Sequence, residues 1–128
     1  MNGVMAKTMP TIILIDDNHE WSLEIQTFLG EAGFSVQVAD DGSVALELLA
    51  EEKPALVILD VHLPQISGFD LLRVVREQNQ ELPVLMVSAD DQAGLMSQAM
   101  CEGASCFLRK PVNCELLLRA ILRFLDES

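Results

Sequence analysis

The sequence predicts a doubly wound α/β fold, in which a five-stranded parallel sheet carries helices on both faces. Apolar runs of strand length alternate five times with segments of helical period, and this rhythm is typical of the class. The runs 12–15 and 56–59 contain no polar residue, which indicates strands buried on both faces of the sheet. At 128 residues, half of them apolar, the chain fits one domain with a single core.

The expected strands and helices follow one another in strict alternation. Apolar runs predict strands at residues 11–15, 34–38, 55–59, 84–87 and 105–108. Apolar residues spaced three or four apart predict helices near residues 20–31, 43–51, 69–78, 92–102 and 114–125.

Glycine and proline mark the ends of these elements. Gly33 follows the first expected helix and Gly103 closes the fourth, both as C-terminal stops. The pair Asp41-Gly42 predicts a turn, and Pro54 and Pro83 each precede a strand. Because no repeat, low-complexity tract or linker interrupts this order, the alternation describes one continuous domain.

The charge balance is strongly acidic, with 20 Asp and Glu against 8 Lys and Arg and a net charge of −12. Such a charge repels phosphate backbones and anionic membrane surfaces, so this domain alone is not expected to bind nucleic acid or membranes. The longest apolar runs also fall far short of the ~20 residues that a membrane span requires.

The cysteines and the N-terminus indicate where the protein works. Cys101, Cys106 and Cys114 are odd in number and lack the spacing of a disulfide framework or a zinc site, which favours free thiols in a reducing cytoplasm. Residues 1–9 carry no secretory signal and are expected to form a short flexible tail. The folded domain is therefore expected at residues 10–128.

Chemically distinctive residues stand at four of the expected strand ends. Asp16 and Asp17 follow the first strand, Asp60 the third and Ser88 the fourth, and Lys110-Pro111 follows the fifth. In open parallel sheets, ligands bind beyond the carboxyl ends of the strands, where several loops meet. We therefore expect these side chains to line one site.

Three carboxylates in one place require a counter-charge, because like charges at close range are costly in a partly buried site. Mg²⁺ prefers oxygen ligands and retains several waters, so the acidic cluster predicts a magnesium site. With Lys110 as a second positive charge, the set suits phosphoryl transfer to one of these carboxylates.

On these motifs the sequence resembles the receiver domain of two-component response regulators, the CheY-like family, over nearly its whole length. The family pattern has an acidic pair after strand one, a phosphoacceptor Asp after strand three, Ser or Thr after strand four and Lys-Pro after strand five. Every element is present here. The resemblance implies a flavodoxin-like strand order of 2-1-3-4-5 and a role in phosphorelay signalling.

The resemblance also implies a role for each site residue. Asp60 would accept the phosphoryl group, Asp17 would bind Mg²⁺ directly and Asp16 would bind it more through water. The backbone carbonyl of His62 would complete the protein ligands, because Mg²⁺ prefers oxygen to imidazole nitrogen. Lys110 would pair with the phosphoryl group. The domain would catalyse its own phosphorylation and dephosphorylation without being an enzyme that releases a product.

Three further residues would transmit the change. Ser88 would move to bond a phosphoryl oxygen, helped by the amide of Ala89, and the aromatic ring of Phe107 would follow that movement. Many relatives have Tyr where this chain has Phe107, so its response would depend on packing. Trp21 is expected near the site at the start of the first helix, where its fluorescence would report metal binding.

Two other phosphate-handling families with related chemistry fit less well. A flavodoxin-type FMN module needs a hydroxyl- and glycine-rich loop after the first strand, where this chain has Asp-Asp-Asn-His-Glu at 16–20. A haloacid dehalogenase needs a second acid two residues after the nucleophile, where this chain has His62. A degenerate receiver would lack Asp60, Lys110 or the acidic pair.

The last two expected helices carry more apolar surface than a core-facing stripe requires. Leu118 and Leu122 widen the apolar arc of helix 114–125, and helix 92–102 is poor in charge. We therefore expect a partner surface at these helices, for a second receiver, a kinase or an output domain. The alternative is that Leu118 and Leu122 lie under a neighbouring element. The resemblance implies a histidine kinase or phosphotransfer protein as the partner that supplies the phosphoryl group. The sequence leaves the kinase, the pathway and any output domain open.

Overall fold

A computed structural model describes residues 9–125 and contains one parallel sheet of five strands. The strands are β1 (Thr11–Ile15), β2 (Ser35–Ala39), β3 (Leu56–Asp60), β4 (Val84–Ser88) and β5 (Cys106–Arg109). Their order in the sheet is β2-β1-β3-β4-β5, which confirms the predicted fold class and strand order. The predicted flexible tail falls almost wholly on residues 1–8, which lie outside the described part.

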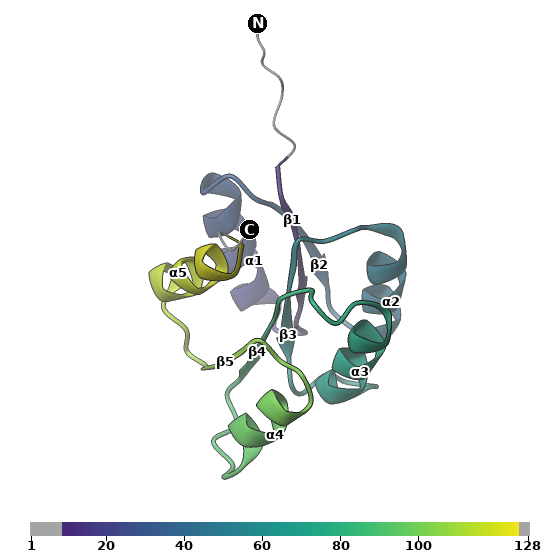
Figure 1. Cartoon of the computed structure of the whole chain (residues 1–128). Coiled ribbons are helices and arrows are strands. Elements are labelled where there is room, and N and C mark those ends of the chain that lie inside the picture. Colours follow the sequence, from purple (N-terminus) through teal and green to yellow (C-terminus); the bar gives the residue numbers. More distant parts are fainter. Residues whose placement is uncertain (1–8, 126–128) are drawn as a thin grey trace, which may run out of the picture.

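Helices cover both faces of the sheet (Figure 1). They are α1 (His19–Glu31), α2 (Gly42–Glu51), α3 (Gly68–Gln78), α4 (Leu95–Cys101) and α5 (Cys114–Leu125). α1 and α5 lie side by side on one face, and α2 and α3 lie on the other. α4 packs through Leu95 and Ala99 into the core on the α2 and α3 face. None of these helices within residues 9–125 has the length and apolar character of a membrane span.

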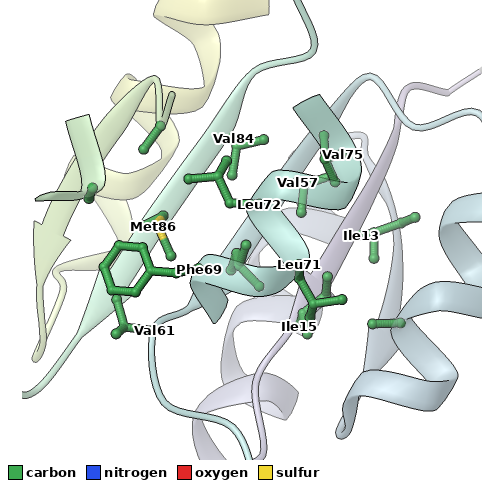
Figure 2. Close-up of a cluster of buried hydrophobic side chains, with 14 of the residues drawn as sticks. Ile13, Ile15, Val57, Val61, Phe69, Leu71, Leu72, Val75, Val84 and Met86 are labelled. Carbon is green, nitrogen blue, oxygen red and sulfur yellow. The ribbon is translucent and has the colours of Figure 1, made fainter. Parts of the chain in front are cut away.

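The two faces of the sheet bury separate hydrophobic clusters. β3 and β4 are buried along their whole length, as expected for strands covered on both sides. Figure 2 shows Leu71, Leu72 and Val75 of α3 packed over strand residues such as Ile15 and Val57. Burial of each such aliphatic side chain stabilises the folded state by about 1.5–3 kcal/mol relative to leaving it exposed. The sheet is therefore a rigid platform for the loops at its edge.

Four strands extend one residue further toward the carboxyl end than predicted. β2, β3, β4 and β5 end at Ala39, Asp60, Ser88 and Arg109. Asp60 and Ser88 consequently belong to their strands, where Asp60 pairs in register with Val87 and Ser88 with Arg109. Ladder pairing fixes the backbone of both residues.

Side-chain capping explains where α1, α2 and α3 begin. Asn18, Asp41 and Ser67 are N-caps whose side chains accept a backbone N–H of the first turn. At the predicted turn Asp41-Gly42 the chain bends from β2 into α2, with Asp41 as the N-cap and Gly42 as the first residue of the helix. The expected stops Gly33 and Gly103 follow α1 and α4 with φ of 103° and 110°.

α4 is shorter than predicted, because it begins at Leu95 and not near residue 92. Gly94, just before it, has φ 90° in the left-handed region, which a right-handed helix cannot include. The apolar spacing continues through this segment, so periodicity alone extended the helix too far.

The prediction that Leu118 belongs to an exposed apolar face is wrong. Leu118 is half-buried and packs against the core cluster of the α1 and α5 face. Leu116 and Leu122 are the exposed leucines of α5. The apolar arc of this helix is wide because α1 covers part of it.

Candidate functional site

The predicted acidic residues meet at the carboxyl edge of the sheet. Asp16 directly follows β1 and is fully buried, Asp17 beside it is exposed, and Asp60 ends β3. One carboxylate oxygen from each lies within 4.8 Å of the others. Distant segments of the sequence thus place three carboxylates together.

Lys110 joins this cluster from the segment after β5. Its ammonium Nζ donates to Asp16 Oδ2 at 2.6 Å and to Asp60 Oδ2 at 3.4 Å. Its backbone N–H donates to the Ser88 carbonyl at 2.9 Å, which fixes the segment against β4. The ammonium therefore faces two acids that come from different strands.

Backbone amides hold the remaining carboxylate oxygens. The N–H of Asn18 donates to Asp16 Oδ1 at 2.8 Å, and the N–H of His62 donates to Asp60 Oδ1 at 3.1 Å. Each buried acid thus has one oxygen on a backbone donor and one on Lys110. This arrangement fixes the orientation of both carboxylates.

Electrostatics leave the cluster with excess negative charge. Burial raises the pKa of Asp60 and the charge of Asp16 raises it further, while the His62 amide and Lys110 oppose the rise. Three carboxylates face one ammonium, so the cluster carries two negative charges in excess when it is ionised. An all-oxygen donor set with this charge fits a divalent cation such as Mg²⁺.

Ser88 is buried at the end of β4, beside the cluster in the sheet order. Its Oγ accepts a hydrogen bond from the backbone N–H of Asp90 at 3.0 Å. Ala89 is exposed at the rim. In this state the hydroxyl is therefore engaged by its own loop.

His62 and Asp90 form a bridge that the sequence analysis did not predict. The Nε2 of His62 lies 2.9 Å from Asp90 Oδ2. The amide of Gln92 and the His62 imidazole lower the pKa of Asp90. Both residues stand two positions beyond the ends of neighbouring strands, and that shared offset was the available signal. The imidazole is thus directed to Asp90.

Two aromatic residues named in the sequence analysis, Trp21 and Phe107, have different surroundings. The ring of Trp21 has its centroid 4.6 Å from Lys110 Nζ, which agrees with the expectation that Trp21 lies at the site. Phe107 on β5 is half-buried, packs against the core on the α4 side, and lines a pocket with Met96, Met100 and Leu116. Its role as a switch stays a prediction.

The three cysteines are free thiols, as predicted. Burial raises the pKa of Cys106 and Cys114, and nearby Glu24 raises that of Cys114 further. A raised pKa lowers the fraction of reactive thiolate. Neither thiol belongs to the acidic cluster.

Comparison with known proteins assigns the chain to a family. Residues 12–122 match the family described as the response regulator receiver domain. The chain belongs to this family. It is therefore a receiver domain of two-component signalling, a family that is phosphorylated on aspartate.

Individual relatives support the assignment. The response regulator MprA of Mycolicibacterium vanbaalenii is 35% identical over 115 residues, which cover 88% of this chain and 50% of MprA. The transcriptional activator ExaE of Pseudomonas putida is 40% identical over 116 residues, covering 89% of this chain and 54% of ExaE. This receiver domain thus spans about half the length of these relatives.

Solved structures share its fold. A CheY-like receiver domain from Methanospirillum hungatei superposes with a TM-score of 0.89 at 25% identity, covering 94% of this chain and 96% of its own. A response regulator from Burkholderia pseudomallei, solved with a phosphorylated aspartic acid and a calcium ion, gives a TM-score of 0.82 at 27% identity, covering 92% and 69%.

Proposed function

We propose that Asp60 is the phosphoacceptor of this receiver domain. The observation that carries the proposal is the convergence of Asp16, Asp17 and Lys110 on Asp60 at the end of a buried strand. A carboxylate oxygen of Asp60 would form a bond to phosphorus while the bond from phosphorus to the donor breaks. A phosphohistidine of a kinase or phosphotransfer protein would supply the group. The domain would promote its own phosphorylation and dephosphorylation and release no other product.

Asp16, Asp17, Asp60 and the backbone carbonyl of His62 would hold Mg²⁺. The all-oxygen donor set and the excess negative charge of the cluster support this assignment. When bound, the ion supplies positive charge for the phosphoryl oxygens. Asp60 would then act as an ionised nucleophile, and Lys110 would stay close enough to pair with a phosphoryl oxygen.

Ser88, Ala89 and Phe107 would carry the change of state to the surface. The Ser88 hydroxyl would leave the amide of Asp90 and donate to a phosphoryl oxygen, beside the amide of Ala89. Phe107 lies three positions before Lys110, on the strand next to β4, so a shift of the segment after β4 would reach its packing.

The output face that we propose is the surface of α4, β5 and α5. Met96, Met100 and Leu116 are exposed there, and Arg119 and Arg123 also line the pocket beside Phe107. A second copy of this chain, with its net charge of −12, would offer acidic groups to these arginines. An output domain is the alternative occupant. We place this exchange in the cytoplasm, which suits three free thiols.

The test of the acceptor is phosphorylation by acetyl phosphate with Mg²⁺, followed by intact mass. The wild-type chain should gain one phosphoryl group, and Asp60→Asn should gain none because a carboxamide is not a nucleophile. Removal of Mg²⁺ by a chelator should also prevent the gain. Phosphorylation of Asp60→Asn, or phosphorylation of the wild-type chain that continues in the presence of the chelator, would contradict the proposal.

A further inference from the structure

Trp21 is connected to the acidic cluster by a short chain of hydrogen bonds. The N–H of Asn18 donates to Asp16 Oδ1 at 2.8 Å, and Asn18 Oδ1 in turn accepts the N–H of Trp21 at 3.1 Å as the cap of α1. The first turn of α1 is therefore oriented by a carboxylate of the site. The indole lies beside Lys110, the lysine partner of that carboxylate.

The ammonium of Lys110 has three neighbours that attract it. Asp16 and Asp60 hold it by ion pairs, and the ring centroid of Trp21 lies 4.6 Å from Nζ, within the distance of a cation–π interaction. The Lys110 side chain is only 13% exposed. Its surroundings are therefore mostly protein and not water, and in such surroundings electrostatic attractions are stronger than in bulk solvent.

We propose that Trp21 is a positioning residue for Lys110, a role that rests on the proposed phosphorylation of Asp60. Lysine has a flexible four-carbon stem, so its ammonium needs fixed contacts to stay in one place. Lys110 Nζ lies 2.6 Å from Asp16 Oδ2 but 3.4 Å from Asp60 Oδ2, so its ion pair with Asp60 is the weaker of the two. The indole face covers a further side of the ammonium and keeps it within reach of Asp60.

A second role for the same ring is packing. Trp21 is half-buried and contacts the core cluster of the α1 and α5 face. An ordinary substitution such as Trp21→Leu would change both the packing and the attraction to Lys110. The test must therefore change the electron density of the ring while its size stays nearly constant.

The chain makes this possible because it has a single tryptophan. Biosynthetic replacement with mono-, di-, tri- and tetrafluorotryptophan changes position 21 alone and progressively weakens the negative ring face. The rate of Asp60 phosphorylation by acetyl phosphate with Mg²⁺ should fall with each fluorine, by about threefold to tenfold over the series. The urea midpoint should fall in step.

Lys110→Met is the matched background for the stability measurement, because methionine keeps an unbranched stem without the charge. The same fluorotryptophans should leave its urea midpoint without a graded trend. Equal trends in both backgrounds would mean that the ring only packs, and would overturn the inference. If all the fluorotryptophan proteins are phosphorylated at the same rate, the inference is overturned as well. If the unsubstituted protein gains no phosphoryl group, the proposed function fails and the positioning role fails with it.

Discussion

Asp60 lies in an environment that opposes its own charge. It is nearly buried and close to Asp16, and both conditions raise its pKa above the ordinary value despite the His62 amide and Lys110. The folded chain therefore binds a proton at Asp60 more readily than the unfolded chain does. As the pH rises from the ordinary carboxyl pKa through the raised value, Asp60 lowers the free energy of unfolding of the domain. The residue that we propose as acceptor is one that the fold must accommodate at a cost.

We therefore expect Asp60→Asn to be more stable than the wild-type domain at pH 7 without Mg²⁺. The expected rise in melting temperature is about 2–6 °C. The gain should shrink as the pH falls and vanish below about pH 3, where the carboxyl is protonated in both the folded and the unfolded states. Thermal unfolding followed by circular dichroism at several pH values measures this.

The control removes one negative charge elsewhere. Glu47→Gln, at an exposed position on α2, should change the melting temperature little at any pH. An Asp60→Asn domain that is no more stable than this control at pH 7 would contradict the assigned burial cost.

The site residues differ in how far the sequence could predict them. Asp16, Asp60 and Lys110 were predictable because parallel strands end at one edge, so that position along a strand gives position in space. The bridge between His62 and Asp90 depends on the path of two loops and on side-chain rotamers. Apolar spacing carries no information about either.

At the scale of an element, α3 begins in contact with the backbone of Asp60, the proposed acceptor. The N–H of Gly68 donates to the Val61 carbonyl at 2.8 Å. A Cβ added at Gly68 would overlap the backbone carbonyl oxygen of Asp60, and backbone cannot move aside as a flexible side chain can. The start of this helix and the end of β3 are thus one packed unit.

Gly68→Ala should destabilise the domain by about 1–3 kcal/mol and slow the phosphorylation of Asp60, since the helix and the strand end must separate. Gly30→Ala is the matched control in α1, where an added Cβ meets no atom within 4 Å. That change should stabilise the domain by about 0.5–1 kcal/mol, because alanine favours helix. Urea unfolding measures both. Equal effects of the two changes would show that the close approach has no energetic consequence.

Helices were predicted in number and order, and the errors have specific causes. The start of α4 was placed too early because Gly94 adopts a left-handed conformation that its apolar neighbours do not signal. Leu118 was assigned to the surface because a helical wheel does not contain the neighbouring helix α1. The first error concerns a local backbone conformation that sets the bound of a helix, and the second a contact between two helices.

At the scale of the whole molecule, two copies should associate through the face of α4, β5 and α5 when Asp60 is loaded. Beryllofluoride with Mg²⁺ imitates the phosphoryl group on the acceptor, and sedimentation measures the mass. Leu116→Glu places a charge on the exposed part of this face and should weaken association at least about tenfold. Leu23→Glu on α1, which is 64% exposed, is the control and should leave association intact. A monomer in both the free and the loaded state would exclude the homodimer.

The whole architecture was the most predictable level. Uninterrupted apolar strands require cover on both faces, and a sheet in this order meets that requirement with α1 and α5 on one side and α2 and α3 on the other. The order itself came from the family resemblance, because burial alone permits other arrangements of the same strands.

The ion pair between Lys110 and Asp16 joins residues 94 positions apart in the chain. Contacts of such high sequence separation form only after the intervening chain has been brought together, which is entropically costly. During synthesis the acids of β1 and β3 emerge long before their lysine, so a growing chain holds carboxylates without the cation that organises them. On the proposed role of Lys110, the domain would therefore be able to accept a phosphoryl group only when β5 has joined the sheet, and an unfinished or misfolded molecule would not be phosphorylated.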